Sequence, residues 1–432
     1  MKTQEITLQN GLRVILVDTN AFPTLTTLLL VGAGSRYENK ENNGIAHFFE
    51  HMAFKGSKKY ENSFVISSTI EGLGGVFNAF TSKDHTGYWI KSTNEHFETI
   101  IDVISDMVLH PLLLEEEINR EKGVIVEEIN MYEDTPSRKV GDYFEGMLYD
   151  GTPLGFDIAG TKKTVNSFTR KTFVDYISAL YHPKNAVLIV AGGLSQKKND
   201  QSKLNNYFEI IKEKFGAWNG SQIGTFKNII ENQTKPQIFV NYKKTEQAHL
   251  CIGFRAFSFL DKQKYVLSVL ATILGGGMSS RLFMQVRERR GLCYYISTGR
   301  ELYHDVGNIV TQAGVTNNID KVKEAIETTL KEHKKMMLGD IKKDELLKAK
   351  ELLKGRLLLS LEDSASVASF YGTKAILENE IMTPEQIITE LEKVSIEEVI
   401  ELSQKLFINK TLNFAIVGPF EKKEDFEAVM QI

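Results

Sequence analysis

The order of predicted strands and helices in the first half of the chain recurs in the second half, and this duplication constrains the fold more than any other feature. Each half begins with strands, continues through an amphipathic helix and a longer helix, and ends on an apolar strand. The final strands, residues 185–192 and 411–418, resemble each other, as do the segments after the long helices, 133–137 and 362–366. The pattern predicts an α+β fold of two related domains, each a mostly antiparallel sheet packed against helices.

A polar stretch at residues 216–236, rich in Asn, Gly, Thr and Gln, is the expected linker between the two domains. The sequence is thereby divided into a first domain at 1–215, this linker, and a second domain at 237–432. A chain of 432 residues is long enough for two hydrophobic cores. Its hydrophobic fraction of 42% and charged fraction of 25% are typical of soluble globular proteins.

The charge and the cysteine content exclude several classes of partner and compartment. A formal net charge of −4 argues against nucleic acid or an anionic membrane as the main partner. No apolar run reaches the ~20 residues that a membrane span needs, and the start of the chain lacks the apolar segment of a secretory signal. Two cysteines, Cys251 and Cys293, cannot form a disulfide framework, which favours a reducing compartment. We expect a cytoplasmic protein.

The segment His47–His51 carries the candidate metal ligands. Residues four apart on a helix lie only about 40° apart around its axis, so His47 and His51 direct their imidazoles toward one point, as zinc ligands must. Glu50 lies about 60° to the other side of His47 and borders the same face. A catalytic zinc site has three protein ligands and an open position for water, so the third ligand must come from elsewhere in the chain.

The long helix expected after Pro111 supplies that ligand. Glu121 and Glu128 are seven residues apart, hence about 20° apart around the helix, and they border an apolar stripe that faces inward. Glu127 points about 100° away from Glu128 and is the weaker candidate. We assign Glu128 as the third ligand and Glu121 as a carboxylate that orients a ligand histidine or tunes the site. Gly123 is expected to lie close to the histidine helix, since an interior glycine costs ~1 kcal/mol relative to alanine.

This residue set predicts one Zn²⁺ per chain and a hydrolytic reaction. Zinc acidifies its bound water and polarises a carbonyl, and Glu50 would take the proton of the water as general base and return it to the leaving amine. The alternative is that two histidines share a helix by accident. A five-residue pattern of this kind arises by chance in roughly one chain in a hundred.

The segment from His47 to Gly56 resembles the active helix of the pitrilysin family of zinc peptidases, the inverzincins, and especially the mitochondrial processing peptidase branch and its bacterial relatives. The resemblance covers nearly the whole chain. It implies a third ligand 77 positions after the second histidine, at Glu128, and a companion glutamate one heptad earlier, at Glu121. The helix geometry and the resemblance therefore choose the same residues.

Two further segments match parts of that family which bind substrate. Residues 77–82 look like the edge strand beside the zinc, where a peptide adds as an extra strand. The resemblance implies that Asn78 holds the substrate and that main-chain groups of Ala79 and Phe80 pair with it, although Asn78 could equally be a turn residue. His85, just beyond this strand, is expected in an exposed polar turn rather than facing substrate.

In the second half, residues 287–294 resemble the segment whose arginine and tyrosine help complete the active site. This implies that Arg287 and Tyr294 are catalytic residues that hold peptide carbonyls and stabilise the oxyanion. The alternative is an arginine-rich helix end on the surface. The second half carries no ligand set of its own, because alignment of the two halves places Leu357 opposite Glu128.

We therefore predict a zinc metallo-endopeptidase that cleaves extended peptides or unfolded protein segments. Both parts of the predicted site occur in one sequence, and in the family's smaller bacterial members two chains close around the substrate, so a homodimer is the simplest prediction. No nucleic-acid or membrane partner is expected. The alternative is a non-catalytic peptide-binding or scaffold subunit of the same family, although such subunits usually lack part of the ligand set.

Overall fold

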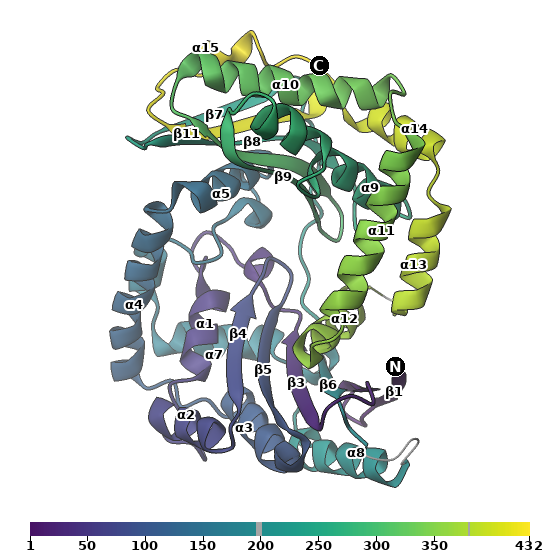
Figure 1. Ribbon diagram of the computed structural model, residues 1–432. Coiled ribbons are helices and arrows are strands. Elements are labelled where there is room, and N and C mark those ends of the chain that lie inside the picture. The colour runs from purple at the N-terminus through teal and green to yellow at the C-terminus, as the bar shows by residue number, and fades with distance from the viewer. Residues whose placement is uncertain (196–200, 379–380) are drawn as a thin grey trace. The chain divides into compact units, whose positions relative to one another are not determined.

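The computed structural model describes residues 1–195, 201–378 and 381–432, and the chain forms two compact units (Figure 1). Unit 1 comprises Met1–Asn130, Phe156–Lys227 and Leu359–Met382. Unit 2 comprises Met131–Gly155, Asn228–Leu358 and Thr383–Ile432. In the described residues, no helix is both long and apolar enough to cross a membrane.

Unit 1 is built on a six-stranded sheet with the order β1-β2-β6-β3-β5-β4. Only β2 and β6 pair in parallel, and all other neighbours are antiparallel. The strands are β1 (Lys2–Thr7), β2 (Arg13–Asp18), β3 (Thr24–Val31), β4 (Val76–Thr81), β5 (Thr86–Thr93) and β6 (Ala186–Gly192). β6 is buried along its whole length because it lies inside the sheet and both of its faces are covered, which explains its uninterrupted apolar sequence. β4 lies at one edge of the sheet.

Helices cover the sheet of unit 1 and contribute to its core. The helices of this unit are α1 (Ile45–Ala53), α2 (Ser63–Gly72), α3 (Phe97–Leu109), α4 (Glu115–Glu133, whose last residues belong to unit 2), α6 (Lys162–Ser167), α7 (Arg170–Leu180), α8 (Gln201–Phe215) and α12 (Ser364–Leu377). Residues 216–236, the predicted linker, contain no helix or strand.

Unit 2 is built on a five-stranded sheet with the order β7-β11-β8-β10-β9. Again a single pair, β7 and β11, is parallel. The strands are β7 (Gln237–Tyr242), β8 (Gln247–Ala256), β9 (Cys293–Leu302), β10 (Gly307–Thr316) and β11 (Leu412–Gly418). The helices are α5 (Pro136–Leu148), α9 (Lys264–Gly275), α10 (Ile319–Met337), α11 (Lys343–Ser360, whose last residues belong to unit 1), α13 (Pro384–Lys393), α14 (Ile396–Leu406) and α15 (Glu424–Glu427). The predicted class, two related α+β domains with mostly antiparallel sheets, is confirmed.

The two units exchange one helix each. α12 follows the long helix of the second half in sequence, yet it packs against β3 and β6 of unit 1, where Thr26 and Ser364 share a hydrogen bond of 2.9 Å. α5 follows the long helix of the first half, yet it packs against β11 and β8 of unit 2, where Phe144 is buried beside Cys251. The predicted domain bounds therefore stay a prediction about the duplicated halves, whereas packing assigns these two helices to the other unit.

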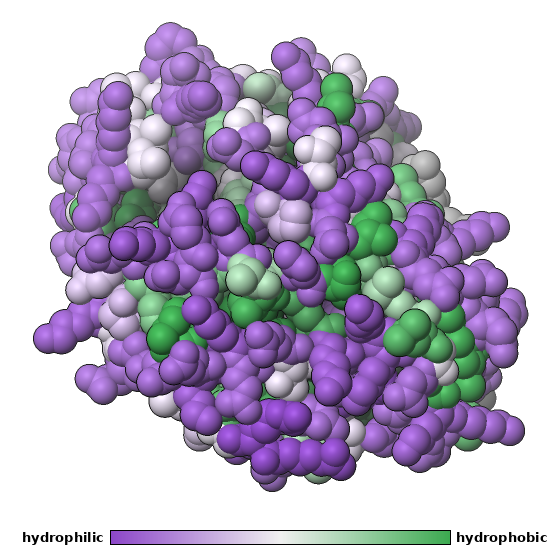
Figure 2. All heavy atoms as spheres, turned by 90° about the horizontal axis from the view of Figure 1, so that it is seen from above, coloured by the Kyte–Doolittle hydropathy of each residue, from purple (hydrophilic) through white to green (hydrophobic). Residues whose placement is uncertain are grey.

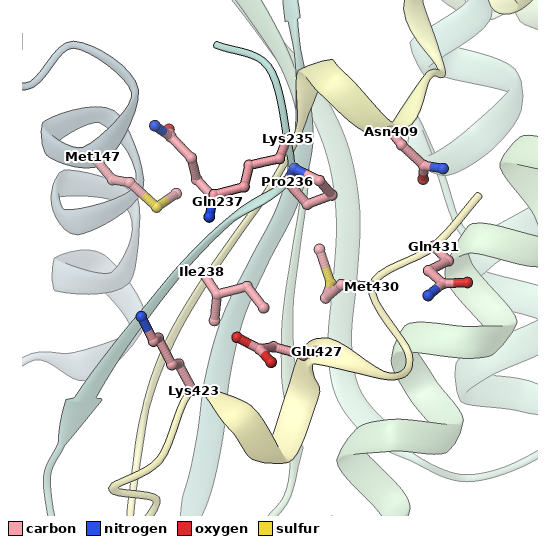
Figure 3. A pocket seen from close by; sticks show the side chains of 10 residues that line it. All are labelled: Met147, Lys235, Pro236, Gln237, Ile238, Asn409, Lys423, Glu427, Met430 and Gln431. Atoms are coloured by element: carbon pink, nitrogen blue, oxygen red, sulfur yellow. The ribbon is translucent and has the colours of Figure 1, made fainter.

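Each unit has its own apolar core, and the face in Figure 2 is mostly hydrophilic with apolar side chains in small groups. Cys251 and Cys293 are both buried free thiols. Unit 2 also contains a cavity of about 740 Å³ beside the start of β7 (Figure 3). None of the predicted site residues lines this cavity.

Candidate metal centre

Helix α1 of unit 1 carries the histidine motif. Its apolar residues Ile45, Phe48, Phe49 and Met52 are buried and fix the helix against the core. The ring of Phe48, for example, meets that of Phe173 on α7 edge-on, with 5.0 Å between centroids. This packing determines the face on which the polar residues of the motif lie.

The start of α1 is capped by a residue from outside the helix. Gly44 precedes the helix with a φ of 98°, and no side chain of its own can cap the first turn. Instead the carboxylate of Glu38 accepts hydrogen bonds from the backbone N–H groups of Gly44 at 2.8 Å and Ala46 at 2.9 Å. The amide of Asn43 donates a third bond to Glu38, at 2.9 Å. Burial raises the pKa of Glu38 to about 7, against the opposing effect of these donors.

Three predicted ligands converge on one point. Oε2 of Glu128 lies 3.6 Å from Nε2 of His47 and 3.5 Å from Nε2 of His51. One ligand atom from each residue lies within 4.8 Å of the other two, and no other group of this kind occurs in the described parts of the chain. Glu127, by contrast, is exposed. The structure thus brings together the residues that helix geometry selected, while their role as ligands stays a prediction.

The spacing of these atoms fits a zinc ion. Ligands at about 2.0–2.1 Å in a tetrahedral arrangement lie roughly 3.3–3.4 Å from one another. The separations of 3.5 and 3.6 Å between Glu128 and the two histidines are close to that value. Two imidazole nitrogens and one carboxylate oxygen are also a donor set that zinc accepts in catalytic sites. The residues present therefore fit this metal.

Glu121 holds the second histidine from behind. Its Oε1 lies 2.9 Å from Nδ1 of His51, while its Oε2 pairs with the ammonium group of Lys55 at 2.5 Å. A hydrogen bond at Nδ1 leaves Nε2 of His51 available toward Glu128. Nδ1 of His47 is buried but has no hydrogen-bond partner within the described residues, so only one of the two rings is held in this way.

The carboxylates make the site attractive to positive charge. Burial alone would lower the pKa of His51, but hydrogen bonds and charge interactions with Glu121 and Glu128 outweigh it and raise the pKa to about 9. Burial would likewise raise the pKa of Glu121, yet His51 and Lys55 hold it below its usual range. The same field that favours a proton here favours a metal cation.

Glu50 is tied to the edge strand. The hydroxyl of Thr81, the last residue of β4, donates to Oε2 of Glu50 at 2.6 Å. Glu50 is partly exposed and lies on α1 between the two histidines. The candidate base is therefore oriented by the strand that the sequence predicts as the substrate edge.

β4 is an edge strand, as the sequence predicts, because it pairs only with β5. The N–H of Ala79 donates to the side-chain oxygen of Asn78 at 2.8 Å. Asn78 is exposed and Phe80 half-buried. The structure thus shows an open edge with one backbone donor covered by a local side chain.

Arg287 and Tyr294 belong to unit 2. Arg287 lies in the helical turn Phe283–Glu288, and its guanidinium is 4.6 Å from the ring centre of Phe283 and 5.8 Å from that of Tyr294. Tyr294 is 74% exposed at the start of β9. The two residues are neighbours, and their participation in the site of unit 1 stays a prediction.

Two expectations from the sequence are wrong. Gly123 does not contact the histidine helix, because a Cβ at this position would have no described atom within 4 Å. His85 does lie in the turn after β4, but it is only 8% exposed. The ring of Phe80 packs against it at 5.8 Å, and burial lowers its pKa to about 4. A local polar sequence cannot reveal that a turn folds inward.

Sequence reasoning also missed three residues that organise the site: Glu38, Lys55 and Thr81. Lys55 lies four residues after His51, and this spacing is the one signal in the sequence that could have identified it. Glu38 and Thr81 act across 8 and 31 positions of sequence, on Ala46 and Glu50 respectively. No periodicity links such pairs.

A converging histidine pair and glutamate on an α+β scaffold define a candidate metal-dependent hydrolase. Comparison with known proteins gives the family: residues 13–162 match the insulinase family (peptidase family M16), and residues 167–353 match the M16 inactive domain. The chain belongs to peptidase family M16.

Its relatives include proteins named as zinc proteases. The uncharacterized zinc protease YmxG of Bacillus subtilis is 35% identical over 96% of this chain and 97% of the relative. The mouse mitochondrial-processing peptidase subunit beta is 31% identical over 99% of this chain and 87% of that protein. The crystal structure of a protease from Helicobacter pylori has the same fold, with a TM-score of 0.89 at 24% identity, covering 97% of this chain and 99% of that one.

Proposed function

We propose that this chain is a zinc metallo-endopeptidase with one Zn²⁺ per chain, bound by His47, His51 and Glu128. The observation that carries the proposal is the convergence of two Nε2 atoms and one carboxylate oxygen at separations of 3.5 and 3.6 Å. When bound, zinc supplies an acidified water and a polarised substrate carbonyl. The family and the relatives named as zinc proteases support the same reading.

In this proposal the side chains of the centre divide the work. Glu50 takes a proton from the attacking water and delivers it to the leaving amine. Thr81 keeps the Glu50 carboxylate in place through the bond of 2.6 Å. Glu121 fixes the tautomer and orientation of His51. The ammonium group of Lys55 pairs with the second carboxylate oxygen of Glu121 and balances its negative charge.

The substrate adds as a strand at the open edge of β4. An extended peptide offers backbone groups that pair with those of Ala79, and Phe80 contributes neighbouring main-chain groups. The side chain of Asn78 would then release the Ala79 N–H and turn to the peptide. Such recognition reads backbone rather than sequence, so it suits extended peptides and unfolded protein segments.

Arg287 and Tyr294 would complete the site by holding peptide carbonyls and stabilising the oxyanion. We propose that the active form is a homodimer in the cytoplasm, where the free thiols Cys251 and Cys293 stay reduced. Mixing two inactive variants, Glu50→Gln and Arg287→Ala, tests whether one chain completes the site of another. Recovered activity, up to about a quarter of wild type for random pairing, supports the shared site. No recovery in a mixture that exchanges subunits argues against it.

The experiment that tests the function measures zinc content and cleavage of a quenched fluorescent peptide together. Wild-type protein should hold one equivalent of zinc and lose cleavage in a chelator such as phenanthroline. Glu50→Gln should keep its zinc and lose turnover by about 10²–10⁴-fold. Glu41→Gln, an exposed carboxylate ahead of the same helix, is the matched control and should cleave normally. Wild-type turnover in zinc-loaded Glu50→Gln would refute the mechanism, and a zinc content near zero in wild type would favour the scaffold alternative.

A further inference from the structure

A short turn connects the start of α1 with the hairpin formed by β4 and β5. Residues 35–38, which we call the 35–38 turn, lie between β3 and α1 in sequence. The N–H of Ser35 donates to the carbonyl of Ser82 at 3.2 Å, and the N–H of Arg36 donates to the carbonyl of Lys83 at 2.9 Å. Ser82 and Lys83 belong to the tip of the β4–β5 hairpin, directly after Thr81.

The 35–38 turn and the residue before it pack closely against the hairpin. A Cβ at Gly34 would lie 2.4 Å from the carbonyl oxygen of Lys83, so the two backbones are in contact. Arg36 is 2% exposed, sits 3.6 Å from Asp84 of the hairpin, and stacks its guanidinium 3.8 Å from the ring centre of Phe226. A buried, paired arginine stacked on an aromatic ring is a rigid anchor.

At its other end the turn presents Glu38 to the first turn of α1. The carboxylate binds the N–H groups of Gly44 and Ala46, where the helix dipole is positive. The segment before α1 is also held from a second side. A Cβ at Gly160 would lie 2.4 Å from the carbonyl oxygen of Asn43, so these backbones touch as well. Lys83 of the hairpin and Tyr176 of α7 are the titratable groups that face Glu38.

The positions of the two predicted histidine ligands depend on the first turn of α1 to different degrees. His51 is held from behind by Glu121 at 2.9 Å. His47 follows Ala46 directly, lies in the first turn of a helix of nine residues, and has no partner at Nδ1 within the described chain. The direction of the His47 ring therefore depends on the backbone of the first turn, which core packing and the hydrogen bonds to Glu38 both hold in place.

We propose that Glu38 is a positioning residue of the metal centre: by binding the first turn of α1 it directs His47 toward Glu128, and the 35–38 turn couples that helix to the hairpin beside the substrate edge. The inference rests on the proposed function, because it concerns the direction of a predicted zinc ligand.

The test measures zinc affinity by competition with a chromophoric chelator, on protein whose fold is checked by circular dichroism. Glu38→Gln should lower the affinity roughly tenfold, the lower end of the range for groups that orient metal ligands. Glu38→Asp, which restores the charge with a shorter reach, should recover part of that loss. Glu41→Gln should match wild type. A merely structural role would lower the unfolding temperature and leave the zinc affinity of the folded protein unchanged.

A second variant covers the case in which Glu38→Gln does not fold. Gly34→Ala keeps Glu38 but forces the 35–38 turn away from the hairpin, so it should also weaken zinc binding. Folded Glu38→Gln or Gly34→Ala with zinc affinity within twofold of wild type overturns the positioning role. Wild type that binds zinc but cleaves no peptide overturns the proposed function alone, since the affinity ratio still decides on Glu38. Wild type that binds no zinc overturns both.

Discussion

Unit 1 and unit 2 share the same topology over five strands of their sheets, yet the candidate metal centre lies in unit 1. The order β2-β6-β3-β5-β4 in unit 1 corresponds to β7-β11-β8-β10-β9 in unit 2, with the parallel pair in the same place. Between the second and third of these corresponding strands in sequence, unit 1 has α1 with its two histidines, whereas unit 2 has α9. From Val266 to Gly275, α9 is buried and devoid of ligand residues.

The difference shows that the sheet does not determine the chemistry. In unit 2 the helix after β8 is used entirely for packing, and the long helix has Leu357 where alignment places Glu128 in unit 1. In unit 1 the corresponding elements bear polar groups that are costly to bury, and three of these groups have supporting partners: His51 pairs with Glu121, Glu121 with Lys55, and Glu50 with Thr81. A metal centre thus requires a set of supporting partners in addition to its ligands.

The largest effect should come from removing the third ligand. Glu128→Gln should weaken zinc binding by more than about 100-fold, since loss of an outer-shell partner already costs 10–100-fold. Glu127→Gln, one position away on the exposed face, should bind zinc as wild type does. Both affinities are measured by chelator competition. Equal zinc affinities in the two variants would mean that the long helix of unit 1 supplies no third ligand at Glu128, so it would not differ in this respect from the long helix of unit 2.

The next effect is on the pH dependence of the free energy of unfolding, to which Glu38 of unit 1 contributes. Its pKa is raised by burial to about 7, so the folded state favours the protonated form, and the stabilisation present below the unfolded pKa is lost as pH rises through 7. Glu38→Gln abolishes this term. Relative to wild type, the variant should therefore gain about 2–3 kcal/mol between pH 4.5 and 8. Urea unfolding of the metal-free proteins measures it, and a constant difference across that range would contradict the assignment.

A smaller effect separates the residue behind the ligands from the ligands themselves. Glu121→Gln should lower zinc affinity about 10–100-fold while leaving one equivalent bound at saturating zinc, because it orients His51 without binding the metal. Isothermal titration distinguishes the two quantities. A stoichiometry of zero at saturation would make Glu121 a ligand instead.

The smallest effects compare the two exchanged helices. A Cβ on Gly372 of α12 would lie 2.8 Å from side chains of Ile189 and Leu30, whereas one on Gly141 of α5 would have no described atom within 4 Å. Gly372→Ala should destabilise the protein by about 1 kcal/mol net of the gain in helix propensity. Gly141→Ala should stabilise it by about 0.5–1 kcal/mol. Thermal unfolding measures both, and the same sign for the two would show that α12 and α5 are packed alike.

The sequence predicted those parts of the site that follow from helical periodicity. Four-residue and seven-residue spacings bring His47, His51 and Glu128 within reach of each other once the two helices pack. The edge position of residues 77–82 also followed, through a resemblance. Long-range contacts could not be predicted, because the capping of α1 by Glu38 depends on the path of the intervening chain.

The errors have a related physical cause. The polar residues around His85 predict an exposed turn, yet tertiary packing buries its side chain against Phe80. Gly123 suggests a close contact, but its surroundings are open, and the structure gives no packing reason for a glycine there. The exchange of α5 and α12 was likewise invisible, because a helix pattern shows that a face is apolar and does not show which sheet covers it.

That exchange has a consequence for biosynthesis. Residues 1–227 can leave the ribosome and form most of unit 1, but the surface of β3 and β6 that α12 covers stays bare until the nascent chain has reached residue 377. α5, in turn, emerges long before β11, one of the strands it covers, at 412–418. Each half must wait for the other to finish. A protein expressed as two separate halves would therefore expose an apolar sheet face on each, and aggregation is the expected fate of such pieces.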